Sequence, residues 1–189
     1  LKDGMRLMNA KGASAILMDV NTGEIISLVS LPDFDPNNRP RAAILGDPSE
    51  NPLFNRAAQG LYELGSTFKI FTAATSLEKG LVNPQTIIDT TPFRWNRKTY
   101  KDYKNYGPTN SVEDIIMKSS NVGTIRMALA AGTSAQKKTL KDLGFFEAVP
   151  VELGEASRTK PQIPKNWSDT STITISFGHG ISATPLHLA

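Results

Sequence analysis

Two absences set the first limits on this chain of 189 residues. It contains no cysteine, which excludes a disulfide framework, a cysteine nucleophile and a thiolate metal site. No apolar run approaches the length of about 18 residues that a membrane-spanning helix needs. The N-terminus also lacks the charged and apolar regions of a signal peptide, so we expect any membrane anchor to lie outside this sequence.

Histidine is scarce as well. The only two, His179 and His187, are too few and too poorly spaced for a metal site, and we expect neither a metal nor a cofactor. A serine–histidine–aspartate triad through His179 is conceivable. The flanking Gly178 and Gly180 instead favour a tight passage of the backbone.

No strong excess of one charge sign is present. The net charge is +3 and the pI is about 9.1. The most basic stretch, residues 94–104, is interleaved with aromatic side chains, and we expect a solvated surface segment rather than a nucleic-acid interface. Hydrophobic residues at 39% and charged residues at 21% predict a single soluble globular domain.

The order of predicted elements favours an α+β fold. Two apolar stretches, residues 13–20 and 24–30, flank an Asn-Thr-Gly turn and predict an antiparallel hairpin. Proline and asparagine predict a long loop over residues 32–52. The later segments are predicted as helices over 66–79, 111–118, 122–131 and 134–144, irregular chain over 83–110 and 151–168, a strand over 170–177, and a helix start at Thr184-Pro185.

A serine three residues before a lysine occurs four times, as Ser66/Lys69, Ser76/Lys79, Ser134/Lys137 and Ser157/Lys160. Residues i and i+3 of a helix lie on one face, so a neutral lysine amine could take the serine's proton. An activated serine is the starting point of acyl transfer. The spacing alone does not choose among the four pairs.

Position in the predicted helices favours Ser66. It follows Gly65 and begins its helix, where free backbone N–H groups and the positive end of the helix dipole favour developing negative charge. Ser76 lies in the last turn of the same helix, Ser134 is expected to be an N-cap, and Ser157 lies in a predicted loop. The apolar residues expected to be buried by the helix of Ser66 are Phe68, Ile70, Phe71, Ala74 and Leu77.

A second motif, Ser119-Ser120-Asn121, falls at the junction of two predicted helices. A Ser-x-Asn triplet there can direct a hydroxyl and a carboxamide into one cleft. The alternative is a simple capping junction, since serine and asparagine suit helix ends. Ser49-Glu50-Asn51 matches the same pattern, but it lies in the proline-rich loop with no helix to fix it.

Together, Ser66-Thr67-Phe68-Lys69 and Ser119-Ser120-Asn121 resemble the first two motifs of penicillin-binding proteins and serine β-lactamases. Further strings resemble class B penicillin-binding proteins, with the septal, cell-division type the most similar. These strings are Leu31-Pro32-Asp33-Phe34-Asp35-Pro36-Asn37, Asn55-Arg56-Ala57, Lys118-Ser119-Ser120-Asn121-Val122-Gly123, Phe177-Gly178-His179-Gly180-Ile181 and Thr184-Pro185-Leu186.

The resemblance implies a β-lactamase/transpeptidase-like α+β fold, with an antiparallel sheet packed with helices and a helical subdomain. It implies a peptidoglycan D,D-transpeptidase that cross-links stem peptides ending in D-Ala-D-Ala during bacterial cell division. The domain would lie on the periplasmic side of the cytoplasmic membrane, anchored by a segment upstream. β-Lactam antibiotics would bind the same site, and other division and wall-synthesis proteins are expected partners.

The resemblance also implies roles for four residues. Ser66 would attack the penultimate D-alanine carbonyl, and Lys69 would act as the general base, for which its amine must be neutral. Ser119 would relay a proton to the leaving nitrogen. Asn121 would hydrogen-bond Lys69 and the substrate amide. The substrate-binding residues are therefore expected to be Ser66, Ser119 and Asn121.

Two departures from the family pattern stand out. Leu64 occupies a position where many relatives have proline, which should alter only the approach to the helix. The third family motif, Lys-Thr-Gly or Lys-Ser-Gly, occurs nowhere in the sequence, although in the family its strand supplies one of two oxyanion N–H groups. We expect residues 1–189 to be the N-terminal and central part of a transpeptidase domain, without the C-terminal strands, and to acylate slowly or not at all.

Two other functions remain open from the residues. A serine β-lactamase would use the same nucleophile but would hydrolyse its acyl-enzyme rapidly. A non-enzymatic module, either a β-lactam sensor or a scaffold for wall synthesis, would not cross-link peptides. The flanking strings favour the transpeptidase over both.

Overall fold

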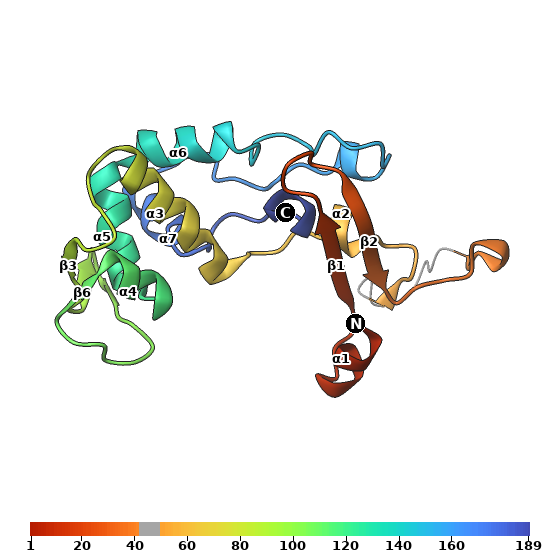
Figure 1. The fold of residues 1–189 in the computed structure, drawn as a ribbon, viewed down its shortest axis with the longest axis horizontal. Coiled ribbons are helices and arrows are strands. Elements are labelled where there is room, and N and C mark those ends of the chain that lie inside the picture. Colours follow the sequence, from red (N-terminus) through yellow and green to blue (C-terminus); the bar gives the residue numbers. More distant parts are fainter. Residues whose placement is uncertain (42–49) are drawn as a thin grey trace. The chain divides into compact units, whose positions relative to one another are not determined.

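The computed structural model describes residues 1–41 and 50–189, and Ser49 of the second Ser-x-Asn match lies outside them (Figure 1). The described chain divides into two compact units. The hairpin unit comprises Leu1–Tyr62, Glu147–Pro161 and Ala183–Ala189, and the helical unit comprises Glu63–Phe146 and Gln162–Ser182. None of the helices in these ranges is long and apolar enough to cross a membrane.

The hairpin unit is built on the predicted antiparallel pair, which is confirmed. Asp19 Oδ1 accepts hydrogen bonds from the backbone N–H groups of Asn21 and Thr22 at 2.8 and 3.2 Å, and Gly23 adopts a φ of +76°. This side chain and this glycine therefore reverse the chain between the two strands. The elements of the unit are α1 (Lys2–Leu7), β1 (Ala13–Met18), β2 (Ile25–Leu31), the 3-10 helices η1 (Pro36–Asn38) and η4 (Ala156–Arg158), α2 (Arg56–Gln59) and α8 (Pro185–Leu188).

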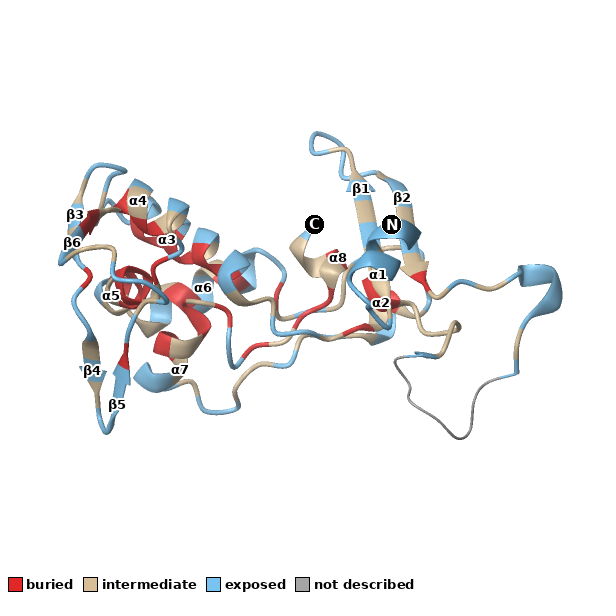
Figure 2. Cartoon of the chain, turned by 90° about the horizontal axis from the view of Figure 1, so that it is seen from below, coloured by how far each residue is buried: buried red, intermediate tan, exposed pale blue. Residues whose placement is uncertain are grey.

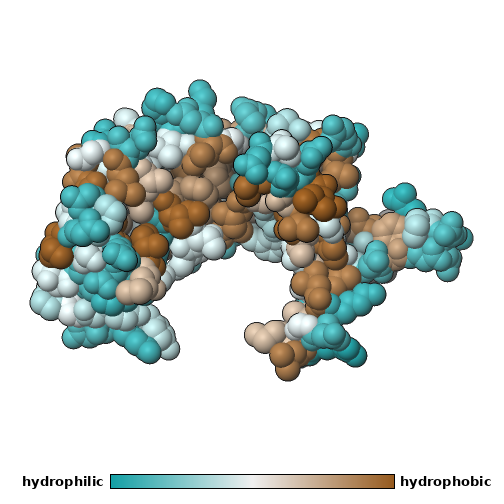
Figure 3. All heavy atoms as spheres, in the orientation of Figure 1, coloured by the Kyte–Doolittle hydropathy of each residue, from teal (hydrophilic) through white to brown (hydrophobic). Residues whose placement is uncertain are grey.

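The two faces of the β1–β2 hairpin have different surroundings. One face packs against the buried side chains of Ala58, Ala156 and Leu186. The other face carries Leu17 and Ile26, which are 57% and 65% exposed. Figure 3 shows the resulting apolar surface over the hairpin. One side of the sheet is thus buried by alternation along β1, and by alternation along β2 that is interrupted by a register shift opposite Leu17 and Met18.

The helical unit contains the four predicted helices, with their caps largely as expected. Ser111 and Ser120 cap two of them, and Gly132, at a φ of +88°, ends the second. The elements of the unit are η3 (Gly65–Phe68), α3 (Lys69–Glu78), β3 (Ile87–Asp89), β4 (Phe93–Trp95), β5 (Lys98–Tyr100), β6 (Thr109–Ser111), α4 (Val112–Met117), α5 (Asn121–Ala131), α6 (Thr133–Asp142) and α7 (Asp169–Ile175).

The strand predicted over residues 170–177 is wrong, because residues 170–175 lie in the helix α7 and residues 176–177 form the turn that follows it. Ser168 and Ser171 make a reciprocal capping box at its N-terminus, and the β-branched residues Thr172, Ile173 and Ile175 are buried. Burial of this face against the unit outweighs the strand preference of β-branched side chains. The alternation of threonine or serine with apolar residues in this segment is therefore not sufficient evidence of a strand.

Two smaller expectations also need correction. Residues 83–110 were expected to be irregular, but they supply β3, β4, β5 and part of β6, which pair as β3–β6 and β4–β5. Ser134 was expected to cap α6, but Gly132 is the N-cap and Ser134 lies within the helix. Both strand pairs are only three residues long on each side, which is too short for a clear alternation.

The apolar face predicted for the helix of Ser66 is only partly buried: Phe68 is buried as expected, but the buried side of α3 is more polar than predicted. Ile70 and Leu77 are 51% and 41% exposed, whereas Thr72 and Ser76 are buried. Figure 2 shows both buried and exposed residues along α3. The Thr72 hydroxyl donates to the Ser176 carbonyl at 3.0 Å, and the Ser76 hydroxyl donates to the Met127 carbonyl at 3.4 Å. Because these hydroxyls have acceptors, their burial is tolerated, and they tie α3 to α5 and the end of α7.

Candidate active site

Ser66 and Lys69 meet as the one-turn spacing predicts. Ser66 lies in η3, the 3-10 turn that leads directly into α3, and its side chain is exposed, whereas Lys69 is only 2% exposed. The amine Nζ of Lys69 donates a hydrogen bond to Ser66 Oγ at 3.2 Å. The pair therefore combines a hydroxyl that a substrate can reach with an amine shielded from water.

The turn before Ser66 is held by a close approach of two backbone segments. The N–H of Gly65, whose φ is +56°, donates to the carbonyl of Gly178 at 3.2 Å. A Cβ built on Gly178 would lie 1.9 Å from the Gly65 carbonyl oxygen, and Gly178 itself has a φ of +83°. Only glycine fits there. The tight backbone passage expected at Gly178 is thus the contact that fixes the start of η3.

Aromatic packing holds the other side of the same turn. The rings of Phe68, Phe71 and Phe145 contact one another edge to face, with centroids 5.1 to 5.2 Å apart. Such pairs add about 0.5–1.5 kcal/mol each beyond their buried area. Phe68 lies between Ser66 and Lys69 in sequence, so its packing anchors the turn that carries both residues.

Ser119 completes a hydrogen-bonded group around the Lys69 amine. Nζ donates to the Ser119 carbonyl at 2.6 Å and to Ser119 Oγ at 2.8 Å, in addition to Ser66 Oγ. Three acceptors match the three N–H donors of a lysine ammonium. Ser119 has a φ of +58°, a left-handed conformation that is uncommon outside glycine. This turn lets one residue offer both its carbonyl and its hydroxyl to the same amine.

Burial lowers the pKa of Lys69 from 10.5 to about 8, and the nearby charge of Asp102 acts in the opposite direction. Desolvation disfavours the charged form of a lysine, which explains the sign of the net shift. A neutral amine is therefore accessible slightly above neutral pH. This is the protonation state that a general base requires.

Asn121 is placed differently from the other three predicted site residues. It is the first residue of α5, directly after the cap Ser120, and its side chain is half-buried. In the described parts of the chain, the hydrogen bonds of Lys69 Nζ go to Ser66 and Ser119, and none joins it to Asn121. The structure therefore brings Ser66, Lys69 and Ser119 together and places Asn121 two residues along from that contact.

Asp102 is a residue of this region that no sequence pattern singled out. Its carboxylate accepts hydrogen bonds from Ser120 Oγ at 2.6 Å and from the Val122 backbone N–H at 3.0 Å. It lies in the segment between β5 and β6, which looked like a solvated basic stretch. A lone acidic residue among Lys101, Lys104 and aromatic side chains was the only signal available.

The other Ser-x-x-Lys pairs lack this arrangement. Ser76 is fully buried and bonded to a carbonyl of α5, and Ser157 Oγ donates to the Gly154 carbonyl at 2.9 Å. His179 Nδ1 lies 3.8 Å from Glu63 Oε2, and within the described ranges no hydrogen bond joins this histidine to Ser66. The structure therefore gives no support to a triad through His179.

An exposed serine bonded to a buried lysine, with a second serine on the same amine, is the arrangement of the class that comprises serine β-lactamases and penicillin-binding proteins. Comparison with known proteins narrows the class. Residues 13–189 match the family model described as the penicillin binding protein transpeptidase domain, and the chain belongs to this family.

The relatives agree with this assignment. Over its whole length the chain is 36% identical to the peptidoglycan D,D-transpeptidase FtsI of Escherichia coli K12, and over 95% of its length it is 34% identical to the probable peptidoglycan D,D-transpeptidase FtsI of Caulobacter vibrioides. It spans 31% and 29% of the lengths of these two proteins. The resemblance to the septal type of class B penicillin-binding protein is thereby confirmed.

Solved structures agree on the fold. The chain superposes with a TM-score of 0.83 on the transpeptidase domain of Burkholderia pseudomallei penicillin-binding protein 3, at 27% identity, covering all of this chain and 51% of that one. It superposes with a TM-score of 0.84 on a structure described as a peptidoglycan glycosyltransferase from Burkholderia ambifaria, at 26% identity, covering 54% of that chain. The predicted β-lactamase/transpeptidase-like fold is confirmed.

Proposed function

We propose that this chain carries the acylation residues of a peptidoglycan D,D-transpeptidase. The observation that supports this most is the hydrogen-bonded group in which the exposed Ser66 hydroxyl and Ser119 Oγ share the buried amine of Lys69. A nucleophile is activated by an adjacent general base, and here the base has a lowered pKa. The names of the E. coli and Caulobacter relatives supply the reaction and its substrate class.

The proposed first half-reaction is acylation. Neutral Lys69 takes the proton of the Ser66 hydroxyl as Oγ attacks the carbonyl carbon of the penultimate D-alanine. The tetrahedral intermediate collapses with cleavage of the peptide C–N bond, and the leaving nitrogen receives a proton through Ser119. The terminal D-alanine leaves, and Ser66 holds the stem peptide as an ester.

The second half-reaction is transfer to an amine of a neighbouring stem peptide. The amine nitrogen attacks the ester carbonyl and gives up a proton to the site, and Ser66 Oγ recovers its proton as it leaves. The product is the cross-linking amide. A β-lactam would acylate Ser66 in the same way, by opening of its ring C–N bond, and would remain attached.

Asn121 is proposed to bind substrate. Its carboxamide offers both a donor and an acceptor, which suits the backbone amide of a peptide. Its place at the start of α5, two residues after Ser119, puts it on the same turn as the proton relay. We therefore assign Asn121 to the stem peptide and not to the orientation of Lys69.

The proposed setting follows from the proposed substrate. Peptidoglycan is cross-linked outside the bacterial cytoplasmic membrane, so we propose that the protein acts on that side, in the periplasm of a double-membrane cell. The septal type of the relatives favours action at the division site together with other wall-synthesis proteins.

Covalent labelling of one serine tests the proposal. The chain is incubated with benzylpenicillin, and intact mass followed by peptide mapping locates the adduct. We expect one adduct, on Ser66, that is lost in S66A and retained in S134A, a control that removes the exposed serine of another Ser-x-x-Lys pair. An adduct on another serine, or an adduct that S66A retains, would contradict the proposal.

A turnover assay separates the transpeptidase from the β-lactamase alternative. A stable adduct with negligible nitrocefin hydrolysis is the expected result. Rapid, repeated turnover would instead identify a hydrolase. Cross-linking of a D-Ala-D-Ala stem peptide to an amine acceptor would further distinguish an enzyme from a sensor or scaffold, which would be acylated without forming a cross-link.

A further inference from the structure

Asp102 contacts the turn that carries Ser119 and Asn121 without belonging to either sequence motif. Its two carboxylate oxygens accept separate hydrogen bonds, from the Ser120 hydroxyl at 2.6 Å and from the Val122 N–H at 3.0 Å. Hydrogen bonds to an ionised acceptor are about twice as strong as neutral ones. The carboxylate also lies at the N-terminus of α5, where the helix dipole favours negative charge.

The Ser120 hydroxyl depends on this carboxylate. Ser120 is 1% exposed, and its Oγ donates to Asp102 while accepting the backbone N–H of Gly123 at 3.0 Å. Loss of the carboxylate would leave a buried hydroxyl proton without its acceptor, which costs more than the hydrogen bond itself contributes. Asp102 therefore stabilises both the capping side chain of Ser120 and the free backbone N–H of Val122 in the first turn of α5.

The neighbouring Ser119 is in a strained conformation that needs support on both sides. On the α4 side, the N–H groups of Ser119 and Ser120 donate to the carbonyls of Ile116 and Ile115 at 3.2 and 2.8 Å. On the α5 side, the support is the Asp102 contact. A serine with a positive φ persists only where its surroundings fix it.

We propose that Asp102 is a positioning residue for acylation: through Ser120 and Val122, it holds Ser119 where its hydroxyl and carbonyl meet the Lys69 amine. The inference rests on the proposed function of Ser66. It extends that function to a residue outside the three family motifs, in the segment between β5 and β6.

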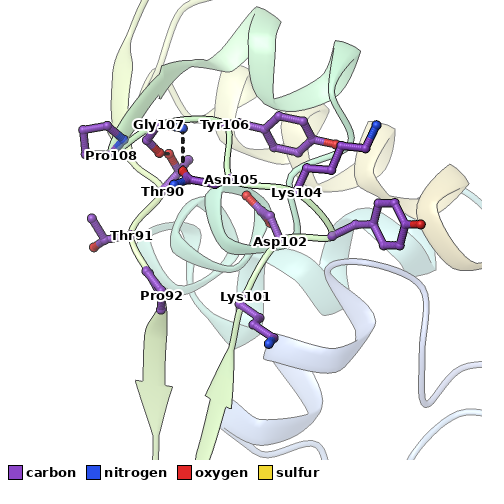
Figure 4. A pocket seen from close by; sticks show the side chains of 11 residues that line it. Thr90, Thr91, Pro92, Lys101, Asp102, Lys104, Asn105, Tyr106, Gly107 and Pro108 are labelled. Carbon is purple, nitrogen blue, oxygen red and sulfur yellow. Dashed lines mark hydrogen bonds between the residues drawn. The ribbon is translucent and has the colours of Figure 1, made fainter.

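The surroundings of Asp102 make its variants informative. Its carboxylate borders a pocket of about 470 Å³ whose lining includes Thr90, Pro92 and Lys101 (Figure 4). A side chain one methylene longer can therefore be accommodated. Within the described part of the chain, Asp102 is also the one charged group whose field shifts the pKa of Lys69, and it shifts it upward.

The test compares D102N and D102E with the unchanged chain. The rate of Ser66 acylation by a fluorescent penicillin is measured from pH 6 to 10. For D102N we expect a plateau at least about tenfold lower, since two charge-assisted bonds to the turn are weakened. We also expect its pH midpoint to fall, because the upward influence of the carboxylate on Lys69 is gone. D102E should recover most of the plateau and the midpoint, and D142N, which removes the carboxylate paired with Lys138, serves as the matched control.

Two results would overturn the inference. One is a D102N profile with the same plateau and midpoint as the unchanged chain. The other is a D102N profile with a lower plateau and an unshifted midpoint, if the control D142N loses as much activity. The same profile would overturn the inference if circular dichroism shows that D102N is globally unfolded. Amide hydrogen exchange at Val122 and Gly123 gives a readout that needs no acylation, and it should accelerate in D102N. The exchange result decides whether Asp102 holds the turn even if the unchanged chain is not acylated, and an adduct on a serine other than Ser66 would count against the proposed function alone.

Discussion

The lowered pKa of Lys69 gives a direct prediction for the pH dependence of acylation. A pKa of about 8 leaves about one tenth of the amines neutral at pH 7 and about nine tenths neutral at pH 9. An unshifted lysine with a pKa of 10.5 would be neutral in only about 0.03% of molecules at pH 7. Burial therefore raises the active fraction at pH 7 by a factor of roughly 300.

The direction of the dependence follows from the role of the amine. In the ammonium form the nitrogen has no lone pair and cannot accept the Ser66 proton, and its three N–H donors are bonded to the two serines. Deprotonation frees that lone pair. The acylation rate should rise about tenfold per pH unit below pH 8 and level off above it.

The measurement is the second-order rate of labelling by a fluorescent penicillin between pH 5.5 and 9.5, with S66A as the blank at each pH. Nuclear magnetic resonance of lysine labelled at the ε-carbon supplies an independent titration, in which one resonance should titrate near pH 8 and disappear in K69R. A flat rate profile between pH 6 and 9, or titration of every lysine near pH 10.5, would refute the reasoning.

Three further predictions concern the parts around the amine. Gly178→Ala should lower the acylation rate at least about tenfold and the free energy of unfolding by about 1–3 kcal/mol, because the new Cβ would collide with the Gly65 carbonyl. Chemical denaturation measures the loss of stability, and an unchanged free energy of unfolding would contradict the prediction. Ser119→Ala should slow acylation by a factor of about 10²–10⁴, as expected for loss of a proton relay. Its midpoint of thermal unfolding should stay within a few degrees of that of the unchanged chain. Full activity would remove Ser119 from the mechanism. A protein of these 189 residues alone should acylate about 10²–10³ times more slowly than E. coli FtsI, because its sequence contains no Lys-Thr-Gly motif, which the family resemblance implies as the source of an oxyanion donor. Equal rates in a side-by-side labelling assay would show that this donor is dispensable.

Local sequence signals predicted most of the elements that carry the site. The turn at Asn21-Thr22-Gly23, the cap at Ser111 and the stop at Gly132 were each read from residue types with specific backbone preferences. One exception is α7, in which burial of one face overrode the strand preference of its β-branched residues. The other is the segment of residues 83–110, which was expected to be irregular and forms the short strand pairs β3–β6 and β4–β5. Propensity is weak where a segment is short and its packing partners come from distant parts of the chain.

By itself, the sequence determined that Ser66 and Lys69 meet. The three-residue spacing puts Ser66 and Lys69 on one helical face, and the glycine before the serine allows the tight turn that begins the helix. Ser119-Ser120-Asn121 was likewise located by its place at a helix junction. These features depend on neighbours within a few residues, which is why a linear reading could find them.

Only the tertiary structure decided the chemistry available to that pair. The pKa of Lys69 is set by its burial, and its three hydrogen bonds include two to Ser119, fifty residues away in sequence. Ser119, with its strained backbone, is followed directly by Ser120, whose hydroxyl donates to Asp102. No sequence motif includes Asp102. Desolvation and long-range hydrogen bonds depend on which distant segments pack together, so the protonation state of the lysine could not be read from the order of residues.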